Sequence, residues 1–168
     1  LMLVPGIQLF ILLIFSLLKY FEPRKENLQK SAKAIAATAT AITSFMAMIE
    51  TGLLLEAFGY HVFAGNYILV GLGVFLAILG NYMSKLRSGF FVGIRTPWTL
   101  SSETVWQKTH RLGGRLFVAA GILIALSALL LPPVISLKLM IGIVLITALL
   151  PVLYSWYAWR IEKNTQNP

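Results

Sequence analysis

The sequence contains no cysteine and only six acidic residues, against fourteen lysines and arginines. The absence of cysteine excludes disulfides, thiol nucleophiles, iron–sulfur clusters and cysteine-ligated zinc. Charged residues make up only 12% of the chain, whereas 58% of the residues are hydrophobic. Because a single domain of 168 residues cannot hide that much apolar surface from water, the composition predicts a membrane protein.

Long polar stretches are also scarce, and five segments are apolar enough to cross about 30 Å of hydrocarbon, which takes roughly 17 to 25 helical residues. Lipid offers no hydrogen-bond partners to a bare backbone, so each segment is predicted to be a helix. The predicted fold class is all-α, a polytopic integral membrane bundle that forms a single domain over residues 1–168. The five expected transmembrane helices cover residues 1–18, 34–58, 62–83, 112–131 and 134–159.

Two features of these segments predict how the helices connect and pack. Small residues at four-residue spacing in the second segment, and Gly73, Ala77 and Gly80 in the third, predict close helix packing, unless they are simply common in such helices. Pro132 and Pro133 break the chain between the last two segments and predict a tight hairpin there.

Basic residues are distributed very unequally over the connections. Five lie between residues 19 and 33 and six between residues 85 and 115, whereas the connection between the second and third segments has none. The positive-inside rule therefore predicts a multi-pass protein of the cell membrane with the N-terminus of this chain outside. Residues 19–33, residues 84–114 and the C-terminal tail are expected in the cytoplasm. The aromatic cluster at the end of the last helix indicates the same interface.

The connection over residues 84–114 is the one long polar segment between hydrophobic blocks. Thr96 should be extended, because the residue before a proline is pushed out of the helical region. A serine, Ser101 or Ser102, is expected to cap a short helix over about residues 102–112. We expect that helix to lie in the cytoplasmic interface with its tryptophan toward the lipid, before a glycine pair turns the chain into the next transmembrane helix.

Four motifs in and before this loop carry a resemblance to a known family. They are Gly80-Asn81-Tyr82-Met83, Phe91-Val92-Gly93-Ile94-Arg95-Thr96-Pro97-Trp98-Thr99-Leu100, Val105-Trp106 and Thr109-His110-Arg111-Leu112-Gly113-Gly114. In these motifs the sequence resembles the SdpI family of bacterial membrane immunity proteins. The resemblance covers about residues 62–160 well, and the first two helices only in general character.

The resemblance implies a six-helix protein of the cytoplasmic membrane that protects the cell against a membrane-acting peptide toxin. It also implies a signalling role, in which a cytoplasmic autorepressor is held at the membrane. This sequence lacks the first helix of the family pattern and begins at Leu1 without the charged region or cleavage site of a signal peptide. We therefore expect an N-terminally truncated member that begins inside a larger protein.

Candidate binding residues follow from the motifs and from one acid in a hydrophobic segment. Arg95 is either an interfacial cation that sets topology or a donor fork for a lipid phosphate or a partner's carboxylate. The tryptophans of the loop are either membrane-belt residues or binding residues. The candidate partner-, toxin- or lipid-binding residues are Arg95, Thr96, Pro97, Trp98, Trp106, His110, Arg111 and Glu50.

Glu50 lies inside a hydrophobic segment, where an acid is costly and normally faces the interior of the bundle. Gln8 and Asn66 are expected at a comparable depth, which predicts a shared polar cluster in the outer half of the bundle. The alternative is that Glu50 snorkels to the outer headgroups. An alternative function is a small transporter or flippase-like protein with Glu50 as its coupling acid, although the sequence shows no matching pair of broken helices.

His110 is the one histidine of the polar loop, and His61 is expected on the opposite side of the membrane. A metal site would need several N, S or O ligands, so we favour a neutral His110 that is hydrogen-bonded to the loop backbone. No motif with a defined catalytic mechanism occurs, and we predict no enzyme, no cofactor and no metal. The expected partners are membrane lipids, a peptide toxin and a cytoplasmic repressor, with no direct binding of nucleic acid.

Overall fold

The structure is a computed structural model that describes residues 3–60 and 66–166, and within these ranges every regular element is a helix. The predicted all-α class is therefore confirmed for this part of the chain. The helices are α1 (Leu3–Phe21), α2 (Lys25–Lys30), α3 (Ala32–Ala57), α4 (Tyr67–Met83), α5 (Pro97–Ser101), α6 (Glu103–Leu130) and α7 (Pro133–Gln166).

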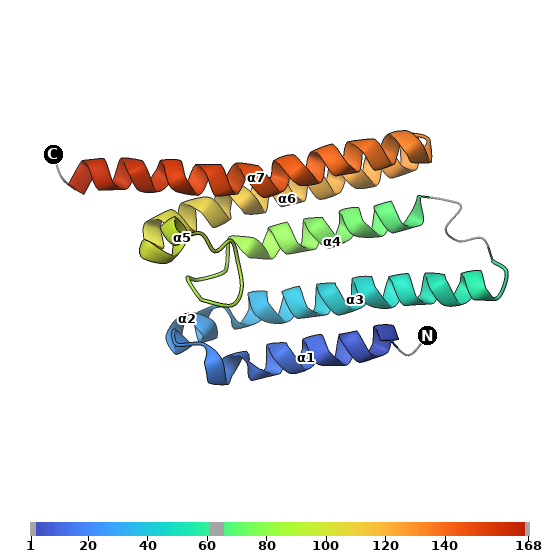
Figure 1. The fold of residues 1–168 in the computed structure, drawn as a ribbon, viewed down its shortest axis with the longest axis horizontal. Coiled ribbons are helices and arrows are strands. Elements are labelled where there is room, and N and C mark those ends of the chain that lie inside the picture. Colours follow the sequence, from blue (N-terminus) through green and yellow to red (C-terminus); the bar gives the residue numbers. More distant parts are fainter. Residues whose placement is uncertain (1–2, 61–65, 167–168) are drawn as a thin grey trace.

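The long helices lie side by side and alternate in direction (Figure 1). Helix α1 packs on α3, α3 on α4, α4 on α6 and α6 on α7. Helices α3, α6 and α7 are long and apolar enough to cross a membrane, and shorter apolar helical segments cover Pro5–Leu17 and Tyr67–Met83. Large apolar side chains cover the outside of the bundle; Leu129 is 69% exposed and Leu130 76% exposed. Water would penalise this surface and lipid would not, as expected for a multi-pass membrane protein.

The contact between α4 and α6 is made by glycines from both helices. A Cβ atom built on Gly73 would lie 2.5 Å from the carbonyl oxygen of Gly121, and one on Gly80 would lie 2.6 Å from that of Gly114. The two backbones therefore touch directly, which the predicted small-residue stripe of the third segment anticipated. The stripe in the second segment is partly buried as well, with Ala34 2% exposed.

The predicted interfacial helix over residues 102–112 is wrong as a separate element. Residues 103 to 130 form one continuous helix, α6, and the pair Gly113 and Gly114 lies buried inside it instead of turning the chain. A Cβ atom on Gly113 would come within 2.9 Å of the side chains of Ile94 and Met83. The glycines thus let a loop and a neighbouring helix approach α6. Trp106, expected to face lipid, is fully buried.

The remaining boundaries differ less from the prediction. Two short helices, α2 and α5, were not expected, and α7 continues to Gln166, past the predicted end at residue 159. The predicted hairpin after α6 is confirmed, because α6 ends at Leu130 and α7 begins at Pro133. It is fastened by the Ser136 hydroxyl, which donates to the Ser127 carbonyl oxygen at 2.8 Å.

The alternation of directions gathers the polar connections at one end of the bundle, at the left in Figure 1. This end, here called the basic end, consists of residues 19–33, 84–115 and 160–166. It holds every lysine and arginine of the chain except Lys138, which lies near the start of α7. The structure thus brings together the three connections that the charge pattern placed on one side of the membrane.

Candidate functional site

The loop between α4 and α6 ends in a capped turn. Thr96 is extended, with φ −105° and ψ 160°, as the following proline predicts. The Thr99 N–H donates to the Thr96 hydroxyl at 3.2 Å and the Thr96 N–H donates to the Thr99 hydroxyl at 2.9 Å, so each residue satisfies the other's backbone. Ser102 then caps α6 by accepting from the N–H of Val105 at 3.2 Å, as one of the two predicted serines.

His110 holds the centre of the loop. Its Nε2 atom accepts a hydrogen bond from the Ile94 N–H at 2.9 Å, and its Nδ1 atom lies 2.9 Å from the Trp106 carbonyl oxygen. Because Nε2 accepts, the proton must sit on Nδ1, which donates to that carbonyl. The side chain is completely buried. The neutral, backbone-bonded His110 that the sequence predicted is therefore present.

Trp106 lies beneath the same loop. Its ring stacks on the His110 imidazole with centroids 4.0 Å apart and an interplanar angle of 17°. Its indole N–H donates to the Leu86 carbonyl oxygen at 2.9 Å, which ties the start of the loop to α6. Burial with a satisfied N–H is the behaviour of a structural tryptophan.

Gly93 is the one position of the loop that has a positive φ, 120°. A Cβ atom there would lie 2.5 Å from His110 Nε2 and 2.9 Å from the Trp106 ring. Both the backbone conformation and the close approach of the two rings require glycine. The loop therefore passes directly over the His110–Trp106 stack.

The end of the loop contacts α6 again and reaches one further helix, α7. The side chain of Ile94 lies beside Gly113, and the buried hydroxyl of Thr96 lies 3.0 Å from the hydroxyl of Ser155 on α7. Ser155 itself is fully buried. These contacts fix residues 94–96 relative to α6 and α7.

The other side of the loop is held by the connection between α1 and α3. Glu22 is only 4% exposed, and its carboxylate accepts the N–H of Phe90 at 3.0 Å and that of Arg24 at 3.2 Å. The Arg24 guanidinium lies over the Phe90 ring, 4.9 Å from its centroid. A carboxylate that receives backbone N–H groups in this way forms strong, charge-assisted hydrogen bonds.

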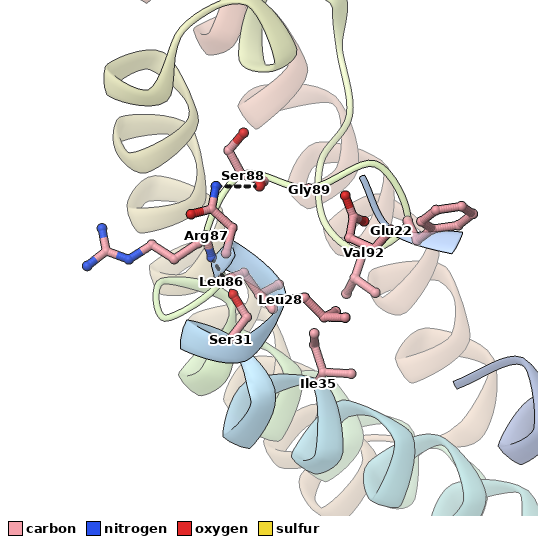
Figure 2. Close-up of a pocket in the computed structure, with 11 residues that line it drawn as sticks. Glu22, Leu28, Ser31, Ile35, Leu86, Arg87, Ser88, Gly89 and Val92 are labelled. Carbon is pink, nitrogen blue, oxygen red and sulfur yellow. Dashed lines mark hydrogen bonds between the residues drawn. The ribbon is translucent and has the colours of Figure 1, made fainter. Parts of the chain in front are cut away.

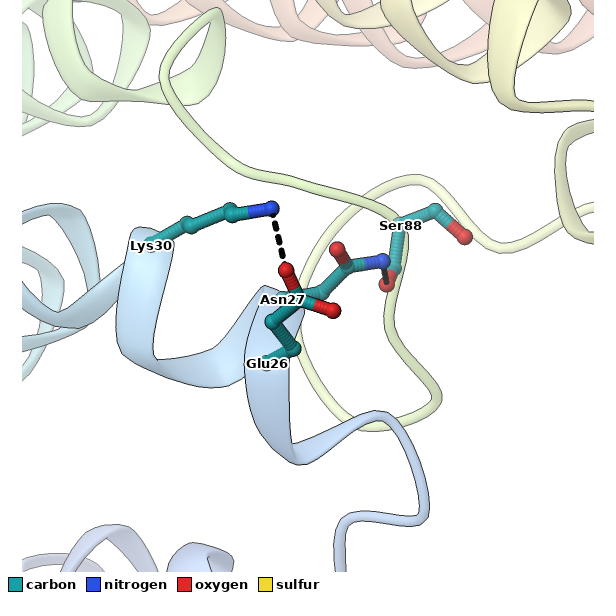
Figure 3. A network of polar contacts seen from close by, with 4 residues as sticks. All are labelled: Glu26, Asn27, Lys30 and Ser88. Carbon is teal, nitrogen blue, oxygen red and sulfur yellow. Dashed lines mark hydrogen bonds and ion pairs between the residues drawn. The ribbon is translucent and has the colours of Figure 1, made fainter.

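Two polar contacts extend this connection along α2 and into α3. The Ser31 hydroxyl accepts the Arg87 N–H at 2.8 Å (Figure 2). The Asn27 amide donates to the Ser88 carbonyl oxygen at 2.9 Å (Figure 3). A cavity of about 20 Å³ remains between the two segments, which is room for about one water molecule. The connection between α1 and α3 thus packs against residues 87–90 of the loop and is hydrogen-bonded to them.

The exposed candidate residues lie on the outside of this fastened loop. Arg95 is exposed, and its guanidinium donates to the Phe90 carbonyl oxygen. Pro97 is exposed as the first residue of α5, and Trp98 is half-buried. Arg111 is exposed on α6, one residue after His110. The structure therefore divides these candidates into three buried residues that hold the loop, namely Thr96, Trp106 and His110, and residues that are exposed or half-buried, namely Arg95, Pro97, Trp98 and Arg111.

Glu50 is not part of this site, because it lies in the second half of α3, toward the end of the helix away from the loop. The Asn66 amide donates to the carbonyl oxygens of Ala128 and Leu131 at 2.8 and 3.1 Å. Among the described residues, no hydrogen bond joins Glu50, Gln8 and Asn66 to one another. The predicted polar cluster is therefore not formed by hydrogen bonds, and the Gln8 Nε2 atom is buried without a partner.

Sequence reasoning missed the partners that the loop finds elsewhere in the chain. Ser155 lies 59 residues from Thr96, and Glu22 lies 68 residues from Phe90, so no local pattern connects them. One signal was available for Glu22, because it is an acid in a connection whose other charges are mostly basic. In residues 3–60 and 66–166 no group of three or more His, Cys, Asp or Glu side chains could hold a metal ion, and His61 lies outside those ranges.

The fold and the site together define a multi-pass helical membrane protein whose long polar loop is fastened to the basic end of its bundle. A model described as the SdpI/YfhL protein family matches residues 85–155, from the loop into α7. Over 150 residues the chain is 30% identical to Immunity protein SdpI of Bacillus subtilis (strain 168), covering 89% of this chain and 72% of that protein. The chain belongs to the SdpI/YfhL family, as the motifs predicted. No solved structure matches it.

Proposed function

We propose that this chain is a membrane immunity protein that protects its cell against a membrane-acting peptide toxin. The observation that carries this proposal is the 30% identity to Immunity protein SdpI over 89% of the chain. The family match includes the loop from residue 85 onward, α5, α6 and most of α7. Protection then proceeds by binding, since the loop offers donors and cations but no nucleophile with an adjacent base.

We infer different roles for the residues of the loop and of the α6 segment beneath it. Thr96, Trp106 and His110 are buried and hold the backbone, so they act as positioning residues. Arg95 is exposed on the loop, and the N–H groups of its guanidinium that do not donate to the Phe90 carbonyl oxygen can bind a carboxylate or phosphate with two parallel hydrogen bonds. In this proposal the outer surface of the loop lies in the cytoplasm. There Arg95 would bind acidic groups of a repressor protein while toxin is present.

Survival of a toxin-sensitive bacterium tests the proposal. A Bacillus subtilis strain that lacks its own immunity protein would express this chain, or carry an empty vector, and be challenged with the peptide toxin of that system. We expect the chain to raise the toxin concentration that halves survival, and to give no protection against an unrelated pore-forming peptide. Equal killing of both strains, with the chain present in the membrane by immunoblot, would refute the proposal.

A further inference from the structure

A groove of about 670 Å³ runs between α4 and α6 at the basic end. Its mouth is polar and its wall, further along α6, is apolar. The mouth is lined by Asn81, Ser84, Arg111 and Arg115, and the wall by Val118, Ala119 and Ile122. Because the residues from α6 recur at three- and four-residue spacing, they form one stripe of the helix, with two cations followed by apolar side chains.

The groove exists because its floor has no side chains. Gly80 and Gly114 lie at the bottom, where a Cβ atom on Gly114 would lie 2.7 Å from the Gly80 carbonyl oxygen. The helices are therefore in backbone contact, and the neighbouring side chains stand up on both sides. Ile122 is 51% exposed although it lies against a packed helix pair. The apolar wall is open to whatever lies beside the bundle.

The two cations at the mouth are not used by the protein itself. Arg111 and Arg115 are exposed, and among the described residues neither forms an ion pair or a side-chain hydrogen bond. The ion pair between Lys30 and Glu26 lies on α2, away from the groove. A second hollow, of about 320 Å³ between α6 and α7, shares both arginines and adds Lys108. Within residues 3–60 and 66–166 none of these three neighbouring cations has an acidic partner, so together they are complementary to an anion.

We propose that this groove binds one anionic phospholipid, with its phosphate between Arg111 and Arg115 and an acyl chain along Val118, Ala119 and Ile122. The arginines provide donor forks that suit a phosphate, and the Ser84 hydroxyl and Asn81 amide lie at the same mouth to bond the headgroup. The position along α6 agrees with this occupant, since Arg115 is the last charged residue of the helix and the residues after it are almost all apolar. A free phosphate would leave the apolar wall uncovered. This proposal rests on the membrane location and is independent of the immunity function.

Native mass spectrometry of the detergent-purified chain tests the site with phosphatidylglycerol, and phosphatidylcholine serves as the uncharged comparison. We expect the chain to retain one phosphatidylglycerol in preference to phosphatidylcholine. The double variant Arg111→Gln/Arg115→Gln should lower the affinity for phosphatidylglycerol roughly tenfold or more. The matched control is Arg160→Gln/Lys163→Gln, which removes the same charge from the same end outside the groove and should bind as the wild type does.

A second variant tests the apolar half of the site separately from the charge. Ala119→Phe places a large side chain in the apolar part of the groove at an exposed position. It should lower the affinity for phosphatidylglycerol although both arginines stay in place. Equal retention by wild type and the double arginine variant, or equal retention of the two lipids, would overturn the proposal. Displacement of the lipid by millimolar glycerol phosphate, or an unchanged affinity in Ala119→Phe, would show a headgroup-only anion site and overturn it as well.

Discussion

Helix α6 makes two contacts that differ in kind, one with α4 and one with the loop that precedes it. Toward α4, the helix presents Gly114 and Gly121, which meet glycines so closely that backbone touches backbone. Toward the 84–102 loop, it presents Trp106 and His110, whose ring nitrogens bond to loop backbone. The first contact depends on the absence of side chains and the second on the hydrogen bonds of two particular rings. The α4–α6 pair is thus held by close backbone packing, and the loop by directed polar contacts.

The difference predicts that the helix contact is the less tolerant of added atoms. Gly80→Val would force a branched side chain against the Gly114 carbonyl oxygen, the Val118 N–H and Phe117, all within 2.8 Å of the new Cβ atom. We expect a loss of about 3 kcal/mol or more in unfolding free energy, because backbone cannot move aside as a side chain can. Thermal unfolding in detergent, with yield from the membrane, measures it.

The matched control is Gly142→Val on α7, where a Cβ atom would have no neighbour within 4 Å. It should leave the unfolding midpoint unchanged or raise it slightly, since glycine is a poor helix former. Equal destabilisation by the two valines would mean that glycine content, and not backbone contact, stabilises the α4–α6 pair.

The loop contact is tested by two glycines that share a positive φ but differ in their surroundings. Gly93 has φ 120° and lies against His110 and Trp106, whereas Gly59 has φ 89° and nothing within 4 Å. We expect Gly93→Ala to cost about 3 kcal/mol and Gly59→Ala about 1 kcal/mol, because the first adds a clash to the backbone strain. Thermal unfolding midpoints compare them. Similar costs would argue against close packing of the loop on the stacked rings.

The smallest effects are expected on α2, where an inward and an outward side chain can be compared. Asn27→Ala removes the donor to the Ser88 carbonyl oxygen and should cost about 1 kcal/mol, with faster amide exchange over residues 86–91. Lys30→Ala removes an exposed ion pair and should change neither quantity. It should instead raise the pKa of the Glu26 carboxyl toward its usual value, because the hydrogen bond and charge of Lys30 lower that pKa. Faster loop exchange in Lys30→Ala would contradict this assignment.

The sequence predicted the features that repeat or that lie close together along the chain. The apolar segments, the glycine stripe of α4, the extended Thr96 and the cap at Ser102 all follow from local patterns, and the structure shows each of them. The continuous α6 was missed because a glycine pair usually signals a turn, whereas here it gives space to Ile94 and Met83. The role of Glu22 was missed because its partner is 68 residues away. Contacts between residues far apart in the chain produce no repeating pattern in the sequence from which they could be predicted.

We propose that the buried residues hold the loop so that Arg95 can bind a partner on its outer surface. The most direct measurement is protection of the toxin-sensitive strain by Arg95→Ala beside Arg87→Ala, another exposed arginine of the same loop. We predict that Arg95→Ala lowers the toxin concentration that halves survival by about tenfold or more, at normal membrane levels and with unchanged amide exchange over residues 84–96, while Arg87→Ala protects fully. Full protection by Arg95→Ala, or equal losses in both variants, would contradict the account.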